Sequence, residues 1–379
     1  MKQFITTHKT LVCIIAVLCV AVIGSVVAFA VGADKEKQEE TTTVSETTIE
    51  ETTTQKETTE TTTVKETADP YLKGGKMYSR LTGMPISKKI GAKRPIAIMI
   101  NNIGDAIPQS GISSADVIYE ATVEGGITRM MAMFENYDKI SRIGSVRSCR
   151  FYFPYWAVEW DAIYAHFGQS GFAMDFLKSG KVDALNAMDN SAFVTFYRDP
   201  SKVAPHNVFA TPAGIRQTIK DKQYRTTYKK NVKKHFQFAK YGTEYILKTG
   251  FKASRIDTNY PVNHSYFVYN KKTKLYERFQ FGTAHIDELN QKQLTCSNVI
   301  IQQADAPLFG DGKSVDFQIV GSGKGMYFTR GKGIKIIWKK SKDTSITHFY
   351  DEKGKEIKLN TGKTFICVMP SDQTPTITK

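Results

Sequence analysis

The segment "ADVIYEATVEGGITRMMAMFEN", residues 115–136, contains two β-type runs separated by a pair of glycines at 125–126. In the first run, Val117, Tyr119 and Ala121 alternate with the residues between them, which is the period of a β-strand. Adjacent glycines between two such runs favour a hairpin turn or a bulge. The segment therefore predicts two strands joined by a short turn.

The neighbouring segments predict a mixture of strands and helices. These are a strand in "RPIAIMINN" (94–102), a helix in "FYFPYWAVEW" (151–160) with Pro154 in its first turn, a strand in "DAIYAHFG" (161–168), a short helix in "SGFAMDFLKSG" (170–180), and a helix from Thr211-Pro212 to about Lys222. After about residue 225, three segments place polar or glycine turns between β-rich runs, which is typical of hairpins. We therefore expect a mixed α/β fold whose N-terminal part alternates strands and helices and whose C-terminal part is mostly β.

The N-terminal end of the chain predicts a membrane anchor. Residues 11–33 form an apolar run without a charged side chain, which at about 1.5 Å per residue matches a hydrocarbon core of roughly 30 Å. Lysines at positions 2 and 9 favour a cytoplasmic location for residues 1–10, so the run is expected to be a single-pass signal anchor. The pattern Ala-Phe-Ala that ends at Ala30 leaves cleavage and secretion as the alternative.

The next segment, residues 34–69, consists almost entirely of Thr and Glu. It has too few apolar side chains to offset the entropy of ordering, so it predicts a disordered stalk. Two domains are expected beyond it, an α/β domain at 70–225 and a β-rich domain at 226–379.

The charge of these two domains limits the class of partner. The whole chain has 52 basic and 37 acidic residues, and residues 70–379 keep 46 and 26 of them, a net charge of +20. A field of this sign attracts polyanions. Nucleic acid is excluded by an extracytoplasmic location, which leaves an anionic cell-wall polymer, the membrane surface or an envelope protein as expected partners. A basic domain that is merely soluble is the alternative.

Several motifs together resemble the YerB family of Gram-positive envelope lipoproteins. They are "RPIAIMINN", "PQSGISSADVIYEATVEGGITR", "RIGSVRSCRFYF", "DAIYAHFGQS", "FYRDPSKVAPHN" and the tail from "VDFQIVGSGKGMYF" to "KLNTGKTFICVMP". The resemblance spans nearly all of residues 90–370 and implies a two-part α/β fold with a layered sheet, located outside the cytoplasm. It implies no activity. The sequence departs from the family pattern in lacking a lipobox and in having Cys149 where the motif carries alanine.

The segment "GSVRSC" contains the strongest candidates for a binding site. Arg147 and Arg150, near the start of the predicted helix, are expected to bind a carboxylate or phosphate with their forked donors. Alternatively, they hold Glu120 and Glu124, which are four residues apart and would share one face of a regular strand. Cys149 lies between the arginines, and an alanine at the matching family position favours packing over a nucleophile.

The loop "YRDPSKVAPHN" offers a second group, Arg198, Asp199, His206 and Asn207. An Asp and a His together are typical of acid–base chemistry, although a loop clasp that bonds open backbone groups explains them equally. No second histidine lies four residues from His206 and no cysteine is paired with it, so no metal site is predicted. No cofactor is predicted either, because "GSGKG" at 321–325 lacks the spacing of a phosphate-binding loop and is expected to be a turn.

These candidates support two functions. The favoured one is a non-enzymatic envelope protein that binds an anionic polymer or partner through the following residues: Asn102, Glu124, Arg147, Arg150, Arg198 and Asn207. The alternative is a cell-wall hydrolase that would use four acid–base candidates: Glu120, His166, Asp199 and His206.

Overall fold

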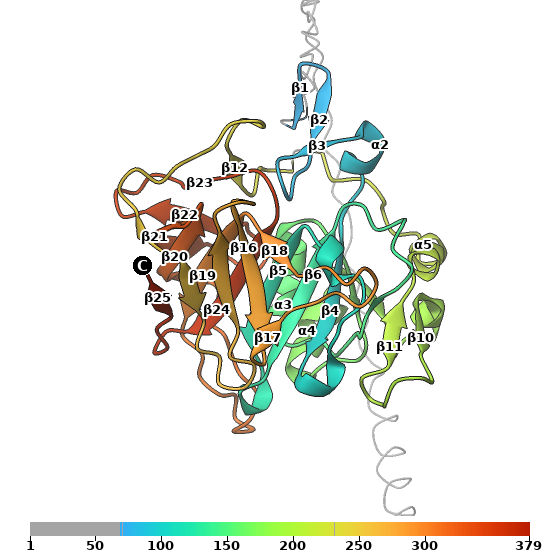
Figure 1. The fold of residues 1–379 in the computed structure, drawn as a ribbon. Coiled ribbons are helices and arrows are strands. Elements are labelled where there is room, and N and C mark those ends of the chain that lie inside the picture. Colours follow the sequence, from blue (N-terminus) through green and yellow to red (C-terminus); the bar gives the residue numbers. More distant parts are fainter. Residues whose placement is uncertain (1–68, 70, 231) are drawn as a thin grey trace, which may run out of the picture. The chain divides into compact units, whose positions relative to one another are not determined.

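The computed structural model describes residue 69, residues 71–230 and residues 232–379. Its largest element is an 11-stranded mixed sheet with the strand order β13-β21-β20-β19-β24-β5-β6-β4-β8-β9, in which β22 pairs with β21 (Figure 1). The strands are β4 (Ile96–Asn102), β5 (Val117–Thr122), β6 (Thr128–Phe134), β8 (Ile163–His166), β9 (Asp183–Asn186), β13 (Phe251–Lys252), β19 (Asn298–Ala304), β20 (Gly321–Thr329), β21 (Lys332–Lys340), β22 (His348–Asp351) and β24 (Thr364–Pro370).

Smaller sheets and short helices surround this large sheet. A six-stranded sheet is formed by β14 (Arg255–Asp257), β15 (Tyr266–Asn270), β16 (Leu275–Gln280), β17 (Thr283–Ala284), β18 (Thr295–Cys296) and β25 (Thr376–Thr378). Three minor sheets contain β1 (Leu72–Lys73), β2 (Lys76–Tyr78) and β3 (Pro85–Ile86); β7 (Ile143–Gly144), β10 (Phe196–Arg198) and β11 (Val208–Ala210); and β12 (Gln237–Phe238) with β23 (Lys358–Leu359). The helices are α2 (Lys88–Gly91), α3 (Phe153–Glu159), α4 (Met174–Lys178), α5 (Pro212–Asp221) and five 3-10 turns, η1 (Gly104–Ala106), η2 (Ile112–Ser114), η3 (Glu124–Gly126), η4 (Gly171–Ala173) and η5 (Asn190–Thr195).

The predicted hairpin at 115–136 is confirmed. Strands β5 and β6 are antiparallel, with Val117 opposite Met133 and Thr122 opposite Thr128. Gly125 and Gly126 join them with φ angles of 67° and 72°, a left-handed conformation that glycine adopts without steric cost. The predicted strands at β4 and β8, the helix α3 with its early proline, and the helix α5 capped by Thr211 are confirmed as well.

Alternation along the central strands divides the interior into two cores. Val117, Tyr119 and Ala121 point to one side of the large sheet, where α3 and α4 pack; we call this side the helix face. Ile118 and its counterparts on β4 and β6 point to the other side, covered by the six-stranded sheet and α5; we call it the sheet face. The result is three layers, which agrees with the layered sheet implied by the resemblance.

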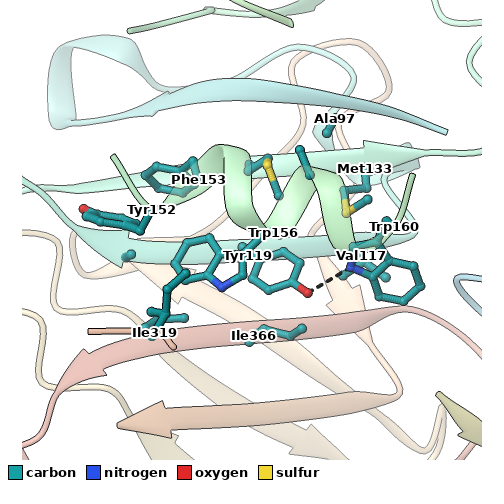
Figure 2. Close-up of a cluster of buried hydrophobic side chains, with 14 of the residues drawn as sticks. Ala97, Val117, Tyr119, Met133, Tyr152, Phe153, Trp156, Trp160, Ile319 and Ile366 are labelled. Atoms are coloured by element: carbon teal, nitrogen blue, oxygen red, sulfur yellow. Dashed lines mark hydrogen bonds between the residues drawn. The ribbon is translucent and has the colours of Figure 1, made fainter. Parts of the chain in front are cut away.

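Helix α3 is attached to the helix face by aromatic contacts (Figure 2). The ring of Trp156 stacks on that of Tyr119 with 5.0 Å between centroids. Trp160 donates a hydrogen bond from Nε1 to the Tyr119 hydroxyl at 2.9 Å. The aromatic run in the sequence is therefore a packing surface that fixes the helix on the sheet.

Every named element after α5 in the described part of the chain is a strand, as predicted for residues 226–379. Some of these strands form sheets of their own, such as the six-stranded sheet, but β24 pairs in parallel with β5 and so joins strands of the C-terminal half to the sheet of the N-terminal half. The expectation of a turn at 321–325 is wrong, since these residues begin β20. A Cβ at Gly325 would lie 2.3 Å from the Ile301 carbonyl oxygen, so glycine there permits close strand pairing.

No helix within residues 69, 71–230 and 232–379 is both long and apolar enough to span a bilayer. The predicted anchor at 11–33 and its cytoplasmic flank at 1–10 lie outside the described residues, as does the stalk predicted at 34–69 except for Asp69. Asp69 forms an ion pair with Arg80 at 2.6 Å.

Candidate anion-binding site

Residues 145–149 lie between β4 and β8 and position Arg147. The amide of Arg147 donates to the Met99 carbonyl on β4 at 3.1 Å, and the Arg147 carbonyl accepts from the Phe167 amide, just after β8, at 3.1 Å. Arg147 and Arg150 therefore precede α3, which begins at Phe153. They do not lie on the helix itself, because pairing of the Arg147 backbone to both neighbours keeps this segment extended.

Four guanidinium groups lie close enough around residues 147–150 for their charges to interact. Arg129 from β6, Arg147, Arg150, and Arg198 from β10 form what we call the arginine cluster. Arg129 is 4% exposed, and burial together with the charges of Arg150 and Arg147 lowers its pKa to about 10. Burial also lowers the pKa of Arg147, and the charges of Arg150 and Arg198 lower it further. Like charges held this closely in a partly buried site favour an anionic partner.

Within the described residues, Glu124 is the one acidic side chain that forms an ion pair with the cluster. Its Oε1 accepts from Arg150 Nε at 2.5 Å. Burial opposes ionisation of Glu124, but this hydrogen bond and the charge of Arg150 hold its pKa below the usual value. One carboxylate against four guanidinium groups leaves an excess of positive charge.

Arg129 and Arg147 each have a donor group without a hydrogen-bond partner among the residues that the structure describes. Arg129 Nη1 donates to the Ser148 carbonyl at 2.7 Å, whereas its Nε is buried without a partner in the described part of the chain. Arg147 Nε is likewise buried without a partner there, and Arg147 Nη1 reaches only the Pro205 carbonyl at 3.5 Å. Unmade hydrogen bonds to charged donors are costly, but both Nε atoms are enclosed, so a ligand could contact these side chains only through their terminal nitrogens.

His206 borders this cluster. Asn101 Nδ2 donates to His206 Nδ1 at 2.7 Å, so a neutral ring carries its proton on Nε2. Partial burial and the charge of Arg147 lower the pKa of His206, which keeps the ring neutral near pH 7. The free Nε2–H is a further donor for an anion.

The two ends of the loop "YRDPSKVAPHN" are joined by hydrogen bonds to Asn207. Asn207 Oδ1 accepts from Arg198 Nη1 at 2.8 Å, and the Asn207 carbonyl accepts from the Asp199 amide at 2.8 Å. The carboxylate of Asp199 bonds Ser201 and Arg142, which hold its pKa near 2. Asp199 is therefore an ion-pair partner of Arg142 and is not directed at His206.

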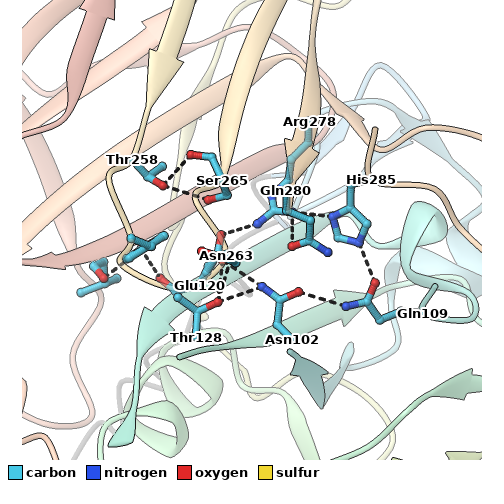
Figure 3. A network of polar contacts seen from close by, with 12 residues as sticks. Asn102, Gln109, Glu120, Thr128, Thr258, Asn263, Ser265, Arg278, Gln280 and His285 are labelled. Carbon is cyan, nitrogen blue, oxygen red and sulfur yellow. Dashed lines mark hydrogen bonds and ion pairs between the residues drawn. The ribbon is translucent and has the colours of Figure 1, made fainter. Parts of the chain in front are cut away.

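Glu120 and Asn102 lie on the opposite, sheet face (Figure 3). Glu120 Oε2 accepts from Arg278 Nη2 at 2.8 Å, and Glu120 Oε1 accepts from Asn102 and Asn263 at 3.0 and 2.7 Å. The expectation that Glu120 and Glu124 share a face is wrong, because β5 ends at Thr122 and Glu124 lies in the turn that follows. Asn102 thus belongs to a buried network and not to the arginine cluster.

The remaining candidates are buried and neutral. His166 is fully buried on β8, its Nδ1 bonds the Gly168 carbonyl at 2.8 Å, and burial lowers its pKa to about 4. Cys149 is also fully buried, and burial raises its pKa to about 12 despite the nearby arginines. A neutral, inaccessible thiol fits packing, as the sequence favoured.

Arg129 is the member of the cluster that sequence reasoning missed. It lies within the apolar run of β6, which reads as a core strand. The sequence does contain a signal, because an arginine inside an apolar strand needs a polar environment on the face to which it points. Arg278, the partner of Glu120, gives no such signal, because it lies in a predicted hairpin rich in polar residues, where an arginine is expected to be exposed.

The chain is therefore a layered α/β protein with a basic surface and an arginine cluster. Residues 81–225 match the family model described as "Protein of unknown function (DUF3048) N-terminal domain", and residues 256–366 match the corresponding "C-terminal domain". The Bacillus subtilis (strain 168) protein named "Putative lipoprotein YerB" is 30% identical over 306 residues, which cover 80% of this chain and 89% of that protein. The crystal structure of Bacillus subtilis YerB superimposes with a TM-score of 0.70 at 29% identity, covering 80% of this chain and all of the other. The chain belongs to the YerB family, which confirms the resemblance.

Proposed function

We propose that this protein is a membrane-anchored, extracytoplasmic member of the YerB family that binds an anionic cell-wall polymer through the arginine cluster. The observation that carries the proposal is the charge imbalance, since four guanidinium groups face a single paired carboxylate, Glu124. The net charge of +20 on residues 70–379 supports the same class of ligand. The name of the Bacillus subtilis relative, which includes "lipoprotein", supports the envelope location.

The hydrolase alternative has no support from the geometry of its candidate residues. Glu120 is bonded to Arg278 on the sheet face, His166 is enclosed, and Asp199 is paired with Arg142. His206 is left without a carboxylate partner within the described residues. Acid–base catalysis requires such groups within hydrogen-bond reach of one substrate.

Removing two guanidinium groups from the cluster tests the proposal. In the full-length protein, Arg147→Ala with Arg198→Ala should weaken cosedimentation with purified Bacillus subtilis cell walls by about tenfold or more, since each lost charge-assisted contact is worth roughly 1.5–3 kcal/mol. The matched control is Arg216→Ala with Arg255→Ala, which removes the same charge from two side chains that are 49% and 41% exposed elsewhere.

The control should bind within about twofold of wild type if the charge location matters. Equal binding by wild type and the cluster variant, with both folded by circular dichroism, would contradict the proposal. Equal losses in the cluster variant and the control would show that binding reflects net charge alone.

A further inference from the structure

A long groove lies at the C-terminal end of α3, away from Arg150 at the other end. It has a volume of about 1080 Å³ and is bounded by the turn at 180–181, residues 229, 232 and 233, the last residues of β21 and the segment after β21 up to residue 346. Its walls carry Lys181, Lys229, Lys233, Lys339 and Lys342, and we call it the lysine groove.

The acidic side chains in this groove already have partners. Glu159 is buried and bonds Lys340 at 2.8 Å and His235 at 3.2 Å. Asp161 pairs with Arg225 at 2.6 Å. These carboxylates therefore do not neutralise the lysines on the walls.

The charge on the walls is largely unopposed. Lys181 pairs with Asp343 at 2.6 Å, but the four other wall lysines are exposed and have no acidic partner in the part of the chain that the structure describes. These four are Lys229, Lys233, Lys339 and Lys342. A concave surface with charges of one sign concentrates counter-ions.

A buried network holds the groove in shape. Glu159 Oε2 accepts from the Thr347 amide at 2.9 Å and from its hydroxyl at 2.8 Å, in addition to Lys340. Lys340 also donates to the Ser345 carbonyl, which attaches the segment 341–346 to the end of β21. The backbone that carries Lys339 and Lys342 is thus held by buried contacts before any ligand binds.

We propose that the lysine groove binds a linear, phosphate-bearing polymer. Lysine is a compact point charge suited to phosphate, and here the charges come from several separate segments that line one groove. A flexible chain can enter such a groove, whereas a flat bilayer contacts only its rim. This inference rests on the proposed function in taking a polymer as the ligand.

The test uses full-length protein in detergent and long-chain inorganic polyphosphate as the probe. A variant with all four unpaired lysines changed to glutamine (Lys229→Gln, Lys233→Gln, Lys339→Gln and Lys342→Gln) should bind polyphosphate at least about tenfold more weakly than wild type. The matched control changes four exposed lysines elsewhere, Lys88→Gln, Lys89→Gln, Lys271→Gln and Lys272→Gln, and should bind within about twofold of wild type.

Equal losses in the groove variant and the control would overturn the proposal. So would a groove variant that binds polyphosphate normally but no longer binds phosphatidylglycerol vesicles, because the surface would then recognise a membrane. The variant Arg147→Ala with Arg198→Ala separates the two proposals. If only that variant loses polymer binding, the groove inference fails and the proposed function stands. If only the groove variant loses polymer binding, the groove inference stands and the role of the arginine cluster in the proposed function fails.

Discussion

Replacing Arg278 with methionine should lower the free energy of unfolding by about 3–5 kcal/mol, because it removes one partner of a buried ion pair. Arg278 is 1% exposed and Glu120 is fully buried, so the carboxylate would lose its cation in a site that water does not reach. The pair also joins β16 of the six-stranded sheet to β5 of the large sheet. Urea unfolding followed by circular dichroism measures the change.

Two further variants show whether the loss comes from the uncompensated charge. Arg255→Met, which changes an arginine of the same small sheet that is 41% exposed, should cost less than about 1 kcal/mol. Adding Glu120→Gln to Arg278→Met should recover part of the loss, since no charge is then left unpaired. A cost below about 1 kcal/mol for Arg278→Met alone would contradict the assignment of this pair as a buried structural element.

Glu135 should make the protein less stable as the pH rises. Burial and the nearby charge of Asp116 raise the pKa of Glu135 from 4.5 to about 7. A carboxyl whose folded pKa is raised contributes stability that is full below about pH 4.5 and is lost as the pH rises through about 7. Since one pKa unit corresponds to about 1.4 kcal/mol, wild type should lose roughly 2–3 kcal/mol from this group between pH 4.5 and pH 8.

Glu135→Gln should remove that loss. The amide keeps an acceptor for the Arg80 amide, which bonds Glu135 Oε1 at 2.9 Å, but it cannot ionise. Buried histidines such as His166, whose pKa is lowered to about 4, act in the opposite direction at acid pH and are common to both proteins. The difference between the two unfolding curves across pH therefore reports Glu135 together with its coupling to Asp116, whose pKa is itself raised to about 6. Parallel curves would show that the Glu135 carboxyl ionises freely in the folded state.

The local elements of the fold could be predicted because their signals are short-range. Alternation along β5, the glycine pair before β6 and the proline at the start of α3 each determine one element. The pairing of β24 with β5 could not be predicted, because strands so distant in the chain carry no sequence signal for their register. Two halves that read as separate domains consequently both contribute strands to the large sheet.

The arginine cluster was partly predictable for the same reason. Arg147 and Arg150 share one motif and Arg198 belongs to another, and both motifs are rich in polar side chains within turns. Arg129 was missed because its strand reads as core. Glu120 was misread as a catalytic candidate because its partner, Arg278, is 158 residues away and only the sheet packing brings them together.

The dependence of wall binding on salt tests the central claim most directly. The affinity of wild-type protein for purified cell walls should be measured from low to high sodium chloride, alongside Arg147→Ala with Arg198→Ala. If the arginine cluster holds the anionic ligand, wild-type binding falls steeply as salt screens the contact, and the variant binds weakly with a shallower dependence. Identical affinities and identical salt dependence for the two proteins would contradict the account.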